Sequence, residues 1–163
     1  MVFEFGNNTV DVDVERTREY YKTAKYITEE CQCDGCCNYV AAVECFPKEV
    51  KVLFESLGVD IRKSHEVGAY AAVDGGKAAY YAGFYHLCGK ILSPGDYEVW
   101  HQGSHKAEIH DEKLYVISKG YSIAFTNHVA LLDADFPSPA IQMEIIFENV
   151  PWGLEKENSY YRT

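Results

Sequence analysis

The first third of the chain carries apolar residues at the spacing of amphipathic helices. The clearest stripe has the i, i+3, i+4, i+7 pattern of one buried helical face. Its members are Val50, Leu53, Phe54 and Leu57. Pro47 suits the first turn of this helix, and Gly58 suits a left-handed C-cap that lets Val59 fold back as an apolar contact. The pattern therefore predicts a helix that ends just before Gly58.

Two further helices are expected before this one. A helix from Asp11 or Asp13 to about Glu30 has apolar residues close to a 3.6-residue period. Its last residues are acidic, which does not suit the negative end of a helix dipole. After a break, Asp34 can cap a shorter helix that runs through Cys45.

Beyond residue 65 the apolar period changes from helical spacing to two, as in strands that bury one face. Gly75 and Gly76 lie between two strand-like runs and predict a hairpin turn, with Val73 opposite Ala78. Shorter strands are expected after it. The further hairpin pairs expected from this turn are Ala71 with Tyr80, Ala69 with Ala82 and Val67 with Phe84.

These patterns predict an α+β fold with N-terminal helices packed on a mainly antiparallel β-sheet of about six strands. The helical part spans about residues 11–58 and the sheet part about residues 66–150. A chain of 163 residues suits one domain, so residues 1–163 are expected to form a single unit. The end of the chain is expected to fray after Glu157.

Composition narrows the classes of function. Acidic residues outnumber basic ones by 25 to 15, which gives a formal net charge of −10. No cluster of cations suits a phosphate backbone, so we expect no nucleic-acid binding. An acidic surface suits solubility or a basic protein partner. Apolar runs fall far short of the roughly 20 residues that cross a bilayer, and the N-terminus does not resemble a signal peptide. We therefore expect no membrane contact and a cytoplasmic protein.

The cysteines carry the sharpest local signal. Five of the six lie within fifteen positions, and four of these form the pattern Cys-x-Cys-x-x-Cys-Cys. Thiolates bind zinc, so a structural zinc is possible. A second ligand pair is missing, and a further ligand would have to come from Cys45, Cys88 or a histidine. The candidate metal ligands are Cys31, Cys33, Cys36 and Cys37.

Other interpretations of these cysteines stay open. Cys33 and Cys36 have the spacing of a redox pair at a helix N-terminus. They follow a predicted helix, however, whereas a thioredoxin-like pair follows a strand. Asp34 between them also opposes thiolate formation. The plainest alternative is a set of buried, reduced thiols that fill a corner between helices.

A group of histidines and a group of tyrosines are further candidates for a metal site and a ligand-binding face. His101, His105 and His110 lie near Glu108, but their spacing falls short of known metal-site patterns, and exposed hairpin histidines are the simpler interpretation. Three hairpin tyrosines share one strand face with glycine and alanine, which could cradle a flat ligand or seat a helix. These tyrosines are Tyr70, Tyr81 and Tyr85. Nucleotide-binding and hydrolase motifs are absent from the sequence.

Several short segments resemble a family of small uncharacterised bacterial proteins. The resemblance rests on Cys33-x-x-Cys36-x-Asn38-Tyr39, on Leu57-Gly58-Val59-Asp60, on Tyr85-His86-Leu87-Cys88-Gly89 and on a closing segment from Ile145-Ile146-Phe147 through Pro151-Trp152-Gly153-Leu154. It implies one domain of this architecture and no particular activity.

Two functions from different classes fit these observations. The first is a non-enzymatic cytoplasmic binding protein, such as a regulator or an immunity-type inhibitor of a basic toxin, with no cofactor. The second is a metal-binding or thiol-dependent enzyme or sensor centred on Cys31–Cys37. The sequence names no catalytic residue, and the oligomeric state is open.

Overall fold

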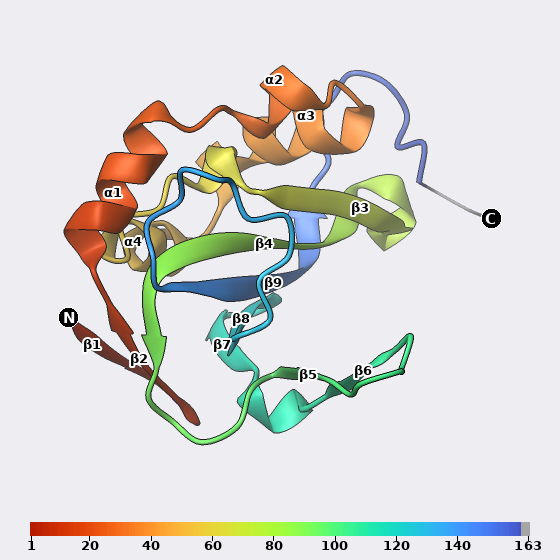
Figure 1. Cartoon of the computed structure of the whole chain (residues 1–163). Coiled ribbons are helices and arrows are strands. Elements are labelled where there is room, and N and C mark those ends of the chain that lie inside the picture. Colours follow the sequence, from red (N-terminus) through yellow and green to blue (C-terminus); the bar gives the residue numbers. More distant parts are fainter. Residues whose placement is uncertain (161–163) are drawn as a thin grey trace.

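The computed structural model describes residues 1–160 and confirms the α+β prediction (Figure 1). Four α-helices lie in the first third of the chain, and a seven-stranded sheet with an antiparallel arrangement fills most of the rest. The helices are α1 (Val14–Thr23), α2 (Ile27–Glu30), α3 (Asp34–Ala42) and α4 (Lys48–Ser56). The sheet contains β1 (Val2–Phe5), β2 (Asn8–Val12), β3 (Glu66–Val73), β4 (Ala78–Ile91), β7 (Tyr115–Ser118), β8 (Tyr121–Thr126) and β9 (Ala140–Pro151). A separate ribbon is formed by β5 (Glu98–Trp100) and β6 (Ala107–Ile109).

The long strand β4 organises the sheet. One of its edges pairs with β9 over most of its length. The opposite edge is shared, because β3 pairs with its first half and β2 pairs with residues 89–91 near its end. Strand β9 then pairs with β8, and β8 with β7. The resulting strand order is β1-β2-β4-β9-β8-β7, with β3 beside β4.

One face of the sheet and the inner faces of the helices form a connected hydrophobic core. Alternate residues of β4 and β9 point to this face, and their large side chains are buried. They include Tyr85, Leu87, Ile141, Met143, Ile145 and Phe147. Helix α4 adds the buried Val50 and Phe54, and its C-cap adds the buried Leu57, whereas Leu53 is only partly buried.

The end of α4 has the predicted cap. Gly58 adopts a φ of +79°, in the left-handed region. The Val59 N–H donates to the Phe54 carbonyl and the Gly58 N–H donates to the Glu55 carbonyl, which together form a Schellman motif. Val59 is buried, which agrees with the prediction that it folds back as an apolar contact after Gly58.

The long first helix predicted to about Glu30 is wrong, because the chain breaks it at Ala24. Residues before Asp13 belong to β2 instead, and the Asp13 side chain caps α1 by accepting from the Arg16 N–H. Helix α2 begins anew after Tyr26, whose N–H donates to the Glu29 carboxylate at 2.6 Å. Glu29 and Glu30 thus lie in the first turn of a helix, where the dipole is positive and favours them.

The hairpin between β3 and β4 has the predicted turn and a partly shifted register. Val73 pairs with Ala78, and the Lys77 N–H closes the turn by donating to the Asp74 carbonyl. Gly75 and Gly76 both have positive φ, which this kind of turn requires. Ala71 pairs with Tyr80 as predicted, but a bulge between Ala69 and Ala71 then moves the pairing by one residue, so the partners predicted for Ala69 and Val67 are wrong. Ala69 pairs with Tyr81 rather than Ala82.

The segment between β8 and β9 crosses the other face of the sheet (Figure 1). From this segment the buried Phe136 packs against His86 of β4, with ring centroids 5.6 Å apart. The same side of the sheet carries Gln142 and Glu144 of β9, opposite His86 and Phe84. Burial is the main reason that the pKa of Glu144 rises to about 7, with nearby Glu98 and Glu66 adding to the rise.

The segment after β9 is tied to the rest of the structure as far as Tyr160, contrary to the fraying predicted directly after Glu157, while residues 161–163 lie outside the described residues. Asn158 is buried, and its side-chain amide donates to the carbonyls of Gly76 and Ala78. The Ala72 N–H donates to the Tyr160 carbonyl. Within the described residues, every helix is too short or too polar to cross a membrane.

Candidate functional site

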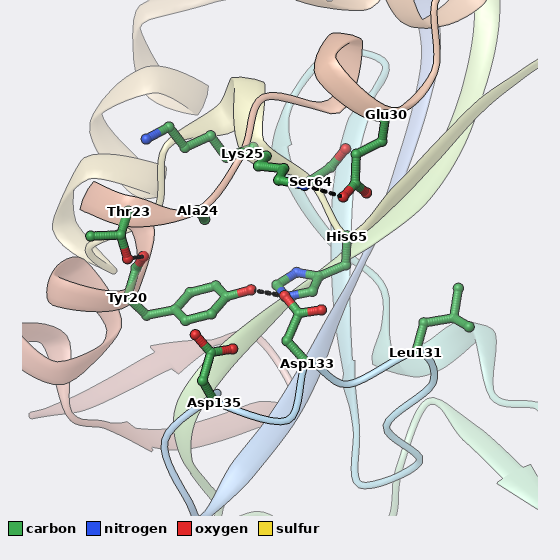
Figure 2. A pocket seen from close by; sticks show the side chains of 11 residues that line it. Tyr20, Thr23, Ala24, Lys25, Glu30, Ser64, His65, Leu131, Asp133 and Asp135 are labelled. Carbon is green, nitrogen blue, oxygen red and sulfur yellow. Dashed lines mark hydrogen bonds and ion pairs between the residues drawn. The ribbon is translucent and has the colours of Figure 1, made fainter.

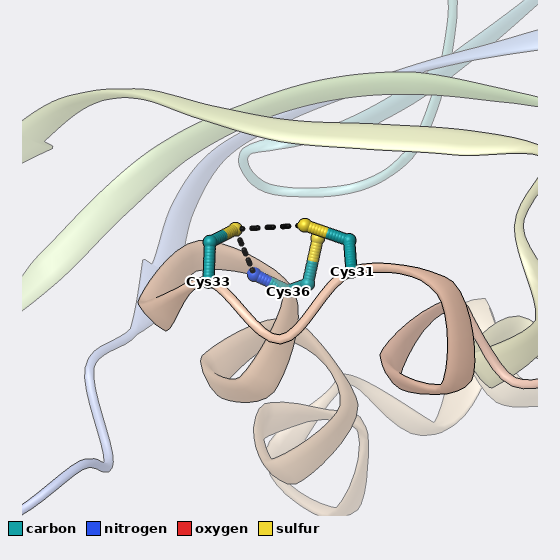
Figure 3. Close-up of side chains that lie close together, drawn as sticks. All are labelled: Cys31, Cys33 and Cys36. Carbon is teal, nitrogen blue, oxygen red and sulfur yellow. Dashed lines mark hydrogen bonds between the residues drawn. The ribbon is translucent and has the colours of Figure 1, made fainter.

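Three of the predicted metal ligands come together between α2 and α3 (Figure 3). Cys31 is the C-cap of α2, Cys33 is the N-cap of α3, and Cys36 lies in the first turn of α3. Their Sγ atoms all lie within 4.8 Å of one another, and those of Cys31 and Cys33 are 3.3 Å apart. The chain reversal between the two short helices produces this convergence. Such a cluster can hold a metal ion.

The helix start favours a thiolate at Cys33. Its partial burial raises the thiol pKa, but hydrogen bonds from the Cys36 N–H, Cys31, Cys36 and Tyr160 outweigh this and lower it. The opposite holds for Cys36, which is 4% exposed. Burial, followed by the neighbouring thiols of Cys31 and Cys33, raises the pKa of Cys36. A second anion beside the first is therefore disfavoured unless a cation joins the group.

The remaining cysteines lie outside this group. The Cys37 thiol points toward the Gln32 carbonyl, 3.7 Å away, although Cys37 follows Cys36 directly. Cys45 is exposed at the end of the 3₁₀ helix η1 (Val43–Cys45). Cys88 is buried in β4, where its backbone N–H donates to the Thr17 hydroxyl. Within residues 1–160 the converging thiols are those of Cys31, Cys33 and Cys36.

The segment after β9 covers one side of the cysteine cluster. Gly35 has no side chain, and a Cβ there would lie 2.8 Å from the Tyr160 hydroxyl, so the glycine makes room for this ring. Asn38 of α3 fixes the start of the segment, because it donates to the Pro151 carbonyl and accepts from the Gly153 N–H. An ion pair between Lys156 and Asp34 adds a further tie. The cluster is thus coupled to this segment.

The predicted histidine group is only partly assembled. On the β5–β6 ribbon, Glu108 lies 2.9 Å from a ring nitrogen of His101 and 3.7 Å from one of His110. His105 is exposed, and its turn does not bring it into this set. These are contacts between surface side chains, in keeping with the plainer interpretation of hairpin histidines.

The tyrosine face of the hairpin seats helices. Tyr81 donates to the Gly35 carbonyl at 2.8 Å, and its ring lies 5.3 Å from that of Tyr39 on α3. Tyr85 packs edge-on against Phe54 of α4 at 5.0 Å. Tyr70 lies at the bulge and is exposed. Helices α3 and α4 therefore cover Tyr81 and Tyr85, and this face is not open to a flat ligand.

A polar pocket that sequence patterns did not reveal lies between α1, the start of β3 and the β8–β9 segment (Figure 2). At its centre the Tyr20 hydroxyl lies 3.1 Å from Nε2 of His65 and donates to the Asp133 carboxylate. The Tyr20 ring stacks on the His65 ring at 5.6 Å. Residues 20 and 133 are far apart in sequence, so no local motif connects them. In the sequence, the pair of aromatic residues Tyr20 and Tyr21 on α1 is the feature that could have pointed to this pocket.

A second histidine lies beneath the first. The His65 and His86 rings are 3.9 Å apart between centroids, and His86 is fully buried. Nε2 of His86 faces the Gln142 side-chain oxygen at 3.3 Å, while Nδ1 has no partner among the described residues. Burial and the His86 neighbour lower the pKa of His65 to about 3, although Asp133 acts in the opposite direction. His65 is therefore neutral at physiological pH.

Comparisons with protein families, with characterised proteins and with solved structures found no match to this chain. The resemblance to a family of small bacterial proteins stays a prediction.

Proposed function

We propose that this chain is a thiolate metal-binding protein that holds zinc through Cys31, Cys33 and Cys36. The observation that carries the proposal is the convergence of three Sγ atoms within 4.8 Å at the junction of α2 and α3. Three thiols contributed by two short elements suit an ion that cross-links them. The ion would stabilise a junction that is otherwise built from a four-residue helix and a short connection.

The spacing of the sulfurs is compatible with this ion. Zinc bonds thiolate sulfur at about 2.3 Å in a tetrahedron, which sets neighbouring sulfurs about 3.8 Å apart. The Sγ atoms of Cys31 and Cys33 are 3.3 Å apart, and no separation among the three sulfurs exceeds 4.8 Å. Small side-chain rotations span that difference. A fourth ligand would be water or another donor, and Cys37 is the nearest in sequence.

The charge distribution supports a cation at this point. The lowered pKa of Cys33 and the raised pKa of Cys36 reflect thiols that cannot all ionise side by side. A divalent ion removes that repulsion and releases the protons, so metal affinity should rise with pH. The same lowered pKa also suits a thiol sensor, because the thiolate is the reactive form. Metal occupancy separates the two possibilities.

The test is metal content and its effect on stability. We expect about one zinc per chain after purification in reducing buffer, and a thiolate-to-metal absorption band when cobalt replaces zinc. A chelator should lower the melting temperature, since the ion binds the native state. Cys33→Ser should abolish binding, whereas Cys45→Ser is the matched control outside the cluster. Reduced protein that takes up neither metal, with a melting temperature unaffected by chelator, would contradict the proposal.

A second candidate function is an interaction with a basic protein, and the β5–β6 ribbon favours it. Cross-strand pairing puts Trp100 and Ile109 on one face of the ribbon, where they are 45% and 48% exposed. Glu98 shares that face, and Glu108 lies on the other. Exposed aromatic side chains bordered by acids suit a partner with basic residues around an apolar patch. This role and the cytoplasmic location stay predictions.

This surface can be tested with paired baits. Wild-type protein, Trp100→Ala and Tyr70→Ala would be compared, since Tyr70 is an exposed aromatic residue on a different strand. A partner retained by wild type and by Tyr70→Ala but lost by Trp100→Ala supports the ribbon. A partner retained or lost by both variants counts against it.

A further inference from the structure

The sulfurs of the cysteine cluster have different surroundings (Figure 3). Cys33 is exposed, and its Sγ accepts hydrogen bonds from the Cys31 thiol at 3.3 Å and from the Cys36 N–H at 3.5 Å. Cys36 is only 4% exposed, and its own thiol donates to the Val67 carbonyl of β3 at 3.9 Å. A small reagent from solvent therefore meets Cys33 before it meets Cys36.

The backbone sets Cys31 and Cys33 on the same side of the chain. Both residues have extended φ and ψ, Cys31 as the C-cap of α2 and Cys33 as the N-cap of α3. Side chains two residues apart in an extended segment point the same way, which accounts for the short distance between these sulfurs. Neither residue belongs to a helical turn, so the two side chains can rotate toward each other without unwinding α2 or α3.

A disulfide between Cys31 and Cys33 needs only a small movement. The sulfurs are 3.3 Å apart and would be about 2.0 Å apart in a disulfide, so an approach of roughly 1.3 Å joins them. Cys36 is the other neighbour of Cys33, but it is held in the first turn of α3 with its thiol directed toward β3. The geometry therefore favours Cys31 as the partner of Cys33.

The same two sulfurs are two of the three proposed zinc ligands. A structural zinc site uses four ligands, and each thiolate must be free to bond the ion. A disulfide between Cys31 and Cys33 leaves Cys36 as the last thiolate of the cluster, which is too few to hold the ion. Metal binding and disulfide formation therefore exclude each other at this junction.

We propose that a hydroperoxide oxidises Cys33, that Cys31 then closes a disulfide with it, and that the bound ion leaves the cluster. The release of the ion rests on the proposed function, because it describes how that metal site is regulated. The thiol chemistry needs only the arrangement of the three sulfurs. A hydroperoxide is small and uncharged, so it reaches an exposed sulfur without a dedicated binding pocket.

The oxidation takes two steps. The Cys33 sulfur attacks one oxygen of the peroxide, the O–O bond breaks, and the departing oxygen takes up a proton to leave as an alcohol or water. The Cys31 sulfur then attacks the sulfur of the resulting sulfenic acid, an S–S bond forms, and the S–O bond breaks to release water. In total two thiols become one disulfide, and the peroxide is reduced to an alcohol and one water, or to two waters for hydrogen peroxide.

The first experiment treats reduced, zinc-loaded protein with a small excess of hydrogen peroxide. The intact mass should fall by that of two hydrogens, and the number of free thiols should fall from six to four. Zinc should be released at the same rate, as measured with a chromogenic chelator. Dithiothreitol should restore the thiols and the capacity to bind zinc. Metal-free protein should lose the same two hydrogens.

Serine variants of the metal-free protein locate the disulfide. Cys36→Ser keeps both reacting sulfurs and should lose two hydrogens as wild type does. Cys45→Ser removes an exposed cysteine outside the cluster and is the matched control. Cys31→Ser and Cys31→Ala should form no disulfide and should stop at a sulfenic acid on Cys33, which dimedone traps. Cys33→Ser should give neither product.

The outcomes separate this inference from the proposed function. A disulfide that persists in Cys31→Ser, or that disappears in Cys36→Ser, would overturn the pairing of Cys31 with Cys33. Zinc uptake by protein that forms no disulfide overturns the inference and leaves the proposed function standing. A disulfide in protein that takes up no zinc overturns the proposed function and the release step, while the pairing stands. Zinc that stays bound after the disulfide has closed overturns the release step alone.

Discussion

Lowering the pH from 7 to 5 should reduce the free energy of unfolding by about 2 kcal/mol through the protonation of His65 alone. The folded state holds this ring neutral, because its pKa is lowered from 6.5 to about 3 by burial and by His86. In the unfolded chain the same ring has its ordinary pKa of 6.5. At pH 5, which is about 1.5 pH units below that pKa, the ring of the unfolded chain is almost fully protonated. The stabilising contribution is fully present above pH 6.5 and is lost as the pH falls toward 3.

Glu144 acts with the opposite sign over the same interval. Burial raises its pKa in the folded state from 4.5 to about 7, so the folded protein binds this proton first as the pH falls. Its contribution is complete below pH 4.5 and disappears as the pH rises through 7. Between pH 7 and pH 5 it adds about 2 kcal/mol, which nearly offsets the loss through His65.

Chemical denaturation at both pH values can separate the two residues. For wild type the two contributions cancel, whereas His65→Gln should gain about 2 kcal/mol relative to wild type on going from pH 7 to pH 5. Glu144→Gln should lose a similar amount. His105→Gln replaces an exposed histidine and should follow wild type. If His65→Gln and wild type change equally, the folded state does not hold His65 neutral and the reasoning is refuted.

Two further stability predictions follow from buried contacts. The Tyr85 hydroxyl donates to the Ile61 carbonyl and accepts from the Tyr39 hydroxyl, so Tyr85→Phe leaves two groups without partners. In chemical denaturation this variant should lose more unfolding free energy than Tyr39→Phe, which should lose roughly 1 kcal/mol. Equal losses would contradict this order of hydrogen bonds. Gly58→Ala should cost more than about 2 kcal/mol, because a Cβ there would lie 2.6 Å from the backbone of α1. Gly75→Ala, with similar positive φ and open space, should show the smaller cost of backbone strain alone.

Local features of the fold could be predicted from the sequence. The α4 stripe and the cap at Gly58 depend on neighbouring residues, and so does the turn at Gly75 and Gly76. The convergence of Cys31 and Cys36 was also within reach, since only a short break in the helix separates them. The break at Ala24 was missed because the sequence has no glycine or proline there, and Glu29 caps the new helix through a side chain.

Features made by distant segments could not be predicted in this way. The pocket joins Tyr20 to Asp133 across 113 residues, and no periodicity encodes such a contact. The bulge at Tyr70 changes the strand register, and Gly68 before it does not by itself fix the position of the shift. The anchoring of Asn158 depends on carbonyls of the β3–β4 turn, which become available only after the hairpin has formed.

The place of β9 in the sheet has a consequence for synthesis. This strand lies between β4 and β8, so both of those strands keep an open edge until residues 140–151 have left the ribosome. Translation adds about 5–20 residues per second, and the core cannot close during that time. The hydrophobic faces of β4 and β8 remain uncovered for several seconds. Demand for chaperones should therefore concentrate in this interval, before the last strand pairs.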